Sequence, residues 1–80
     1  MKAPKIHRVV NLYKKYPHYC VYAYDEKGNV VESGQTASLP YIVQDAKVLN
    51  KDWAKVIIKR HASYTAKPTT VIRTKKKGEL

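Results

Sequence analysis

The fold is decided by the stretch YCVYAYDEKGNVVESG, which covers residues 19–34. Aromatic and β-branched residues lead up to Asp25, a polar loop follows, and a second run of β-branched residues begins at Val30. This pattern predicts a β-hairpin, because such residues favour strands and a short loop containing glycine favours a tight reversal of the chain. A type I turn from Asp25 to Gly28 fits the loop, with Gly28 in the left-handed conformation that glycine adopts without a steric penalty.

That turn predicts which residues of the two strands face each other. The expected pairs are Tyr24 with Val30, Ala23 with Val31, Tyr22 with Glu32, and Val21 with Ser33. Because side chains alternate between the faces of a sheet, one face would hold Tyr22, Tyr24, Val30 and Glu32, and the other Val21, Ala23 and Val31. The second set is apolar and uncharged, so we expect it to form the core beneath the helix residues Ile42, Val43 and Ala46.

The segments around the hairpin predict further elements. Residues 5–13 are strand-like, with an ambiguous core face, and a turn at residues 14–18 would make the first three strands an antiparallel meander. A helix is expected from the N-cap Ser38 to about Asn50, because its apolar side chains recur at helical spacing.

Residues 53–60 predict a strand after the helix. Val56 and Ile58 suit the core, which places Lys55, Ile57 and Lys59 on the opposite face. Residues 69–74 are rich in β-branched side chains and predict an optional edge strand.

Together these elements predict an α+β fold in one small domain, residues 1–80. Its antiparallel sheet would have three to five strands in the order β-β-β-α-β, with an optional fifth edge strand and the helix packed on one face. The ordered core is expected to span residues 5–74. Residues 75–80, with the sequence KKKGEL, should form a disordered basic tail, because lysine and glycine bury little apolar surface.

Positive charge is concentrated at the two ends of the chain, whose formal net charge is +10. Residues 1–18 hold five basic side chains and no acid, whereas residues 54–80 hold eight basic side chains and one acid. If the two ends lie side by side they form a patch that attracts polyanions. The alternative is that the lysines serve solubility alone.

The sequence carries no motif of a nucleotide-binding enzyme. It has three glycines, and neither a phosphate-binding glycine loop nor a dinucleotide fingerprint is present. We therefore expect no enzymatic activity and no cofactor. The single Cys20 cannot form an intramolecular disulfide, and no apolar segment resembles a signal peptide or a membrane span, so a reducing cytoplasmic location without membrane contact is expected.

His18 and Cys20 are two residues apart on a predicted strand, a spacing that a metal ion can use. A structural zinc site needs four ligands, however, and only His7 and His61 remain as nitrogen donors. We therefore expect no metal site. A nucleophilic pair of Cys20 and a histidine is equally unsupported, because nothing in the sequence orients it.

The strongest functional signal is an aromatic and basic set on the sheet face without the helix. Tyr22 and Tyr24 should lie there beside Lys55 and Lys59, an arrangement that stacks bases and holds phosphates in several unrelated folds. The sequence thus favours a nucleic-acid-binding accessory protein, for DNA or RNA. Its predicted binding residues are Tyr22, Tyr24, Lys55, Lys59, Arg8, Lys14, Lys15, Arg60 and Arg73.

Two other interpretations of the same face stay open. The tyrosines could simply fill an ordinary sheet by pairing with Val30 across strands. They could also form a protein interface, which would make the molecule a protein-binding adaptor or inhibitor, or a homodimer, since tyrosine is favoured at interfaces.

Overall fold

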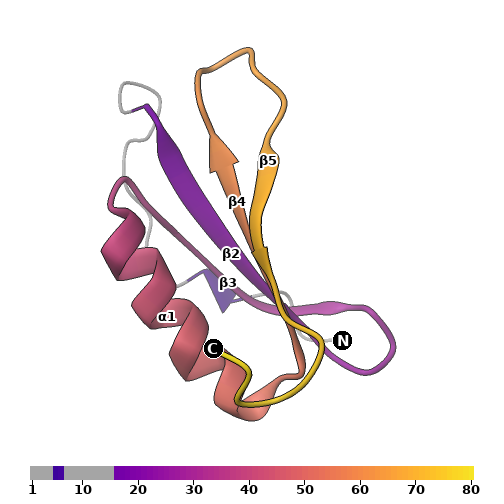
Figure 1. Ribbon diagram of the computed structural model, residues 1–80. Coiled ribbons are helices and arrows are strands. Elements are labelled where there is room, and N and C mark those ends of the chain that lie inside the picture. The colour runs from indigo at the N-terminus through magenta and orange to yellow at the C-terminus, as the bar shows by residue number, and fades with distance from the viewer. Residues whose placement is uncertain (1–4, 7–15) are drawn as a thin grey trace.

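A computed structural model of the protein describes the backbone of residues 5–6 and the whole of residues 16–80. The described part contains the strands β1 (Lys5–Ile6), β2 (His18–Tyr24), β3 (Val30–Thr36), β4 (Lys55–His61) and β5 (Thr69–Arg73), and the helix α1 (Leu39–Asp52). The strands form one sheet in the order β1-β3-β2-β4-β5, and α1 packs against one face of it (Figure 1). The predicted α+β fold is confirmed, with the optional fifth strand formed.

β1 does not take the predicted place in an antiparallel meander. It pairs in parallel with β3, Lys5 with Glu32 and Ile6 with Ser33. β2 cannot accept it, because its two edges are already paired with β3 and β4. The free edge of β3 is the position that remains beside the hairpin. Residues 7–15, which include most of the predicted first strand and the start of the predicted turn, lie outside the described residues.

The hairpin turn is formed as predicted. Gly28 has a φ of +87°, and its N–H donates a hydrogen bond of 3.0 Å to the carbonyl oxygen of Asp25. The Asp25 carboxylate accepts from the backbone N–H groups of Lys27 and Asn29, each at 2.9 Å. These bonds use the polar side chain of Asp25 to fix the turn, which is the usual role of aspartate at such a position.

The register beyond the turn was predicted wrongly, because β3 contains a bulge. Tyr24 pairs with Val30 as expected, but the next pairs are Ala23 with Glu32, Tyr22 with Ser33, and Val21 with Gly34. One extra residue, Val31, lies between the two halves, and its side chain packs against the core. A bulge of this kind moves every following residue to the other face. Glu32 thereby shares the face of Ala23 instead of Tyr22, and Gly34 pairs with Val21 within β3.

The core lies between α1 and the sheet, where the sequence places it. Its buried members are Val21, Ala23, Ile42, Ala46, Leu49, Val56 and Ile58. Val43 packs against them while partly exposed. Burying an aliphatic side chain of this size contributes about 1.5 to 3 kcal/mol, so this cluster supplies the main stabilisation of a small domain.

The helix begins after Ser38, as expected, with Pro40 in its first turn. The Ser38 side chain makes no capping hydrogen bond. The backbone N–H of Ser38 donates to the Thr36 hydroxyl at 3.2 Å. The helix runs past the predicted end at Asn50 to Asp52 because Asn50 is a buried hydrogen-bonding residue and not a cap. α1 is the only helix in the described part of the chain, and it is neither long nor apolar enough to cross a membrane.

The carboxyl-terminal segment, residues 75–80, is not the disordered tail that its composition predicts. It returns to the end of α1 (Figure 1), where the Asn50 amide nitrogen donates to the Lys76 carbonyl oxygen at 3.1 Å. The N–H groups of Gly78 and Leu80 donate to the carbonyl and side-chain oxygens of Asn50, each at 2.9 Å. Leu80 also packs against the core. The lysines stay exposed while the backbone and Leu80 hold the segment in place.

Candidate functional site

The face of the sheet opposite α1 carries most of the predicted binding residues. Cross-strand register puts Tyr24 beside Lys55, Tyr22 beside Ile57, Ile57 beside Arg73, and Cys20 beside Lys59. No helix of the described chain packs on this side (Figure 1). We call it the tyrosine face, and its residues are His18, Cys20, Tyr22, Tyr24, Ser33, Lys55, Ile57, Lys59, His61 and Arg73. Five of the nine predicted residues therefore come together: Tyr22, Tyr24, Lys55, Lys59 and Arg73.

The other predicted residues do not join them in the described structure. Arg60 pairs with Tyr19, so it belongs to the face that α1 covers. The sequence analysis included Arg60 as part of the basic end of the chain, and the alternation of side chains along β4 separates it from Lys59. Arg8, Lys14 and Lys15 lie outside the described residues.

The bulge in β3 determines the charge of the tyrosine face. Glu32 is the one acidic residue in the described strands, and the shifted register removes it from this face. The strand positions of the tyrosine face therefore carry Lys55, Lys59 and Arg73 without any carboxylate. A surface with cations and no acid has a positive potential that attracts anions.

Tyr24 and Lys55 form a cation–π pair at the end of the face near the hairpin turn. The Lys55 ammonium nitrogen lies 4.9 Å from the centre of the Tyr24 ring. Both residues also border a cavity of about 470 Å³ together with Trp53, Asp25, Asp52 and Lys77. Three acidic residues, Asp25, Glu26 and Asp52, and three lysines line this cavity, so its lining carries no net positive charge, unlike the strand positions of the tyrosine face.

Tyr22 and Cys20 interact side by side on β2. Burial, and then the neighbouring Cys20, raise the pKa of Tyr22 to about 12. Burial also raises the pKa of the Cys20 thiol, and the neighbouring Tyr22 hydroxyl offsets part of that rise. Cys20 is 3% exposed. A buried, protonated thiol is a poor nucleophile, so the geometry does not support covalent catalysis at this residue.

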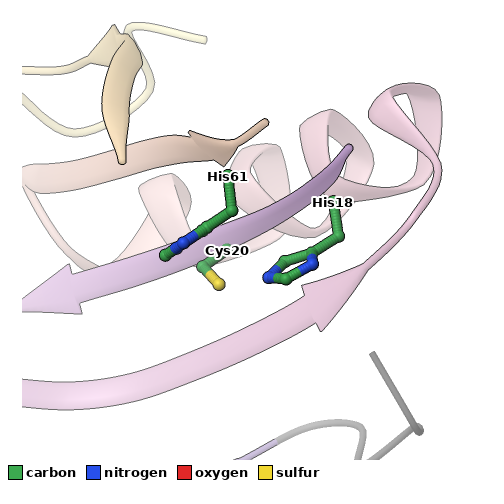
Figure 2. Close-up of side chains that lie close together, drawn as sticks. All are labelled: His18, Cys20 and His61. Carbon is green, nitrogen blue, oxygen red and sulfur yellow. The ribbon is translucent and has the colours of Figure 1, made fainter. Parts of the chain in front are cut away.

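His18 and His61 lie directly opposite each other at the far end of the tyrosine face. Their ring centres are 4.7 Å apart, and the ring planes are nearly parallel, with an angle of 21° between them. The centre of the Tyr16 ring lies 4.8 Å from the centre of the His18 ring. The Cys20 sulfur belongs to the same cluster, in which the potential ligand atoms of His18, Cys20 and His61 lie within 4.8 Å of one another. Figure 2 shows the three side chains on one side of β2 and β4.

His61 is the member of this cluster that the sequence analysis did not place. The predicted strand ended at Arg60, one residue short of β4. Positions 55, 57, 59 and 61 share one face of a strand. Extending the predicted strand by one residue would therefore have placed His61 on the face of Lys55 and Lys59. Within the described residues, the His61 Nε2 atom is buried and has no hydrogen-bond partner. Burial, then His18 and Lys59, lower the pKa of His61, which favours the neutral imidazole.

Comparison with known proteins gave no match to a family model, to a curated protein sequence or to a solved structure.

Proposed function

We propose that this protein binds single-stranded nucleic acid, DNA or RNA, through the tyrosine face. The observation that carries the proposal is the composition of this face: two tyrosines beside Lys55, Lys59 and Arg73, with no acidic side chain at its described strand positions. Aromatic rings stack on bases of any sequence, and cations neutralise phosphates. Such a surface suits an accessory role that requires binding without catalysis.

The spacing of the tyrosines supports this proposal. Tyr22 and Tyr24 are separated by one residue on β2, which places their side chains about 7 Å apart along the strand. Two bases of an extended strand can contact two rings at that separation. Lys55 and Lys59 flank the pair on β4, and Arg73 lies beyond Ile57 on β5.

The two rings are held in different ways. The Tyr22 side chain is partly buried, which restricts its ring before any ligand arrives. The Tyr24 ring has the Lys55 ammonium 4.9 Å from its centre, which helps to hold the ring in place. Arg8, Lys14 and Lys15 stay in the proposal as phosphate contacts, whereas Arg60 does not.

Binding should be measured by fluorescence anisotropy with labelled oligonucleotides over a range of salt concentrations. Lys55→Gln and Lys59→Gln should each flatten the plot of log affinity against log salt by about 0.7 to 1, because each lost phosphate contact releases one counterion fewer. Tyr22→Ala and Tyr24→Ala should each weaken binding by about 1 to 3 kcal/mol and leave the slope unchanged, since stacking releases no ions.

Two matched controls come from the other side of the molecule. Arg60→Gln removes the same charge as Lys59→Gln at the adjacent position, and Tyr41→Ala removes an exposed tyrosine from α1. Both should leave binding close to that of the unsubstituted protein. Equal effects of Lys59→Gln and Arg60→Gln, with no effect at Tyr22 and Tyr24, would contradict the proposal and favour a protein-binding adaptor or inhibitor.

The proposed setting is the cytoplasm, where Cys20 would stay reduced. A nuclear magnetic resonance titration with a short DNA or RNA would map the contact surface independently of any substitution. The expected footprint is the tyrosine face, with the amides of Tyr22, Tyr24 and Arg73 among the signals that shift.

A further inference from the structure

The end of the tyrosine face farthest from the hairpin turn holds a second site. His18 and Cys20 come from β2, and His61 faces His18 from β4, so neighbouring strands deliver all three side chains to one side of the sheet (Figure 2). We propose that His18, Cys20 and His61 bind a Zn²⁺ ion. This site does not depend on the nucleic-acid proposal.

The donor set suits zinc. Zn²⁺ is commonly bound by imidazole nitrogen and thiolate sulfur, and three protein ligands leave one tetrahedral position for water. Magnesium and calcium prefer oxygen ligands, and the cluster offers none from a carboxylate. The His-x-Cys spacing on β2 places both donors on the same face, and the cross-strand histidine completes the set.

The distances require only a small closure. Zn–N bonds of about 2.0 Å and Zn–S bonds of about 2.3 Å imply separations of about 3.5 Å between ligand atoms in a tetrahedral site. The three ligand atoms lie within 4.8 Å of one another. Rotation of the imidazole rings about their side-chain bonds can bring the nitrogens together without moving the strands, because His18 and His61 are already opposite each other.

His61 gives an independent reason to expect a ligand. Its Nε2 atom is buried and has no hydrogen-bond partner among the described residues. A buried polar atom without a partner is unfavourable, and native structures rarely keep one without a reason. A metal ion would use the lone pair of that nitrogen in the neutral imidazole.

Zinc binds the thiolate form of Cys20, so metal binding displaces the thiol proton that burial otherwise retains. Lys59 lies directly across from Cys20 on β4, and its positive charge favours a thiolate. The thiolate in turn offsets the repulsion between Lys59 and the cation.

The proposal is tested by titrating reduced protein with Zn²⁺ against a chromophoric chelator. One equivalent should bind, and His18→Asn, Cys20→Ser and His61→Asn should each lose at least about 100-fold in affinity, since even the outer partners of ligands contribute 10- to 100-fold. Tyr24→Phe, a change on the same strand away from the cluster, should have no effect.

A spectroscopic measurement avoids reliance on variants that may not fold. Co²⁺ added to the unsubstituted protein should give a thiolate-to-cobalt charge-transfer band and the visible absorption of tetrahedral Co²⁺, both displaced by Zn²⁺. Circular dichroism would confirm that each variant is folded. Absence of the charge-transfer band, or equal zinc affinity in the His61→Asn variant, would overturn the proposal.

Discussion

Asn50 shows how a single buried amide holds distant parts of this chain together. It is 0% exposed, and its amide nitrogen lies 3.0 Å from the Trp53 carbonyl oxygen and 3.1 Å from the Thr74 hydroxyl. The same side chain bonds to Lys76 and Leu80. The end of α1, the end of β5 and the carboxyl-terminal segment thus meet at one residue.

Replacing Asn50 should be among the most damaging changes in the protein. Asn50→Ala should lower the free energy of unfolding by at least about 2 kcal/mol, because buried groups that lose their only partner cost about 1 to 3 kcal/mol each. Urea denaturation followed by Trp53 fluorescence would measure it. The near-isosteric Asn50→Asp should be still less stable at neutral pH, because a carboxylate would face the Trp53 and Lys76 carbonyl oxygens. An Asp variant as stable as the unsubstituted protein would contradict this account.

His61 predicts a pH dependence whose sign follows from its environment. Burial and the nearby His18 and Lys59 lower its pKa in the folded protein, so the unfolded chain takes up a proton at a higher pH than the folded one. The contribution of the neutral His61 to the free energy of unfolding is therefore complete above the ordinary histidine pKa of 6.5. It is lost as the pH falls through the lower pKa of the folded protein. Unfolding measured between pH 8 and pH 5, with a chelator present, should show this loss, and His61→Asn should reduce it. An identical pH profile in that variant would refute the assignment.

At the scale of elements, local signals predicted the structure well and long-range ones did not. The Asp25–Gly28 turn and the apolar side of α1 depend on residues that are close together in the sequence, and both are confirmed. The bulge at Val31 was missed because a regular register also places Val31 on the core face, so the alternation of residues alone does not reveal it. The parallel pairing of β1 was missed because it depends on β4, distant in the sequence, occupying the other edge of β2.

Removing residues 75–80 should destabilise the fold, contrary to what their lysine content predicts. The deletion removes the partial burial of Leu80 and the hydrogen bonds to Asn50, for an expected loss of about 1 to 3 kcal/mol in the free energy of unfolding. Replacing Lys75, Lys76 and Lys77 together by serine keeps the backbone and Leu80, and it should change stability by less than about 0.5 kcal/mol per substitution. Equal effects of deletion and substitution would mean that charge, and not packing, holds the segment.

At the scale of the whole molecule, the two faces of the sheet carry different groups of side chains. The face beneath α1 holds the core, and the tyrosine face holds the cations, the rings and the His18, Cys20 and His61 cluster. The alternation of residues on β2 and β4 predicted this division, including the positions of Tyr22, Tyr24, Lys55 and Lys59. The cluster was not predicted, because it depends on the exact end of β4 and on the register that brings His61 opposite His18.

The bulge at Val31 has a consequence for how this chain should be aligned with any relative found later. A sequence that lacked the one codon for Val31 would keep the pairs of Tyr24 with Val30 and Ala23 with Glu32 in a regular hairpin, whereas one that kept Val31 without the bulge would place Glu32 beside Tyr22. A one-residue gap at this position would therefore preserve the basic sheet surface, and an ungapped alignment would not by itself guarantee it.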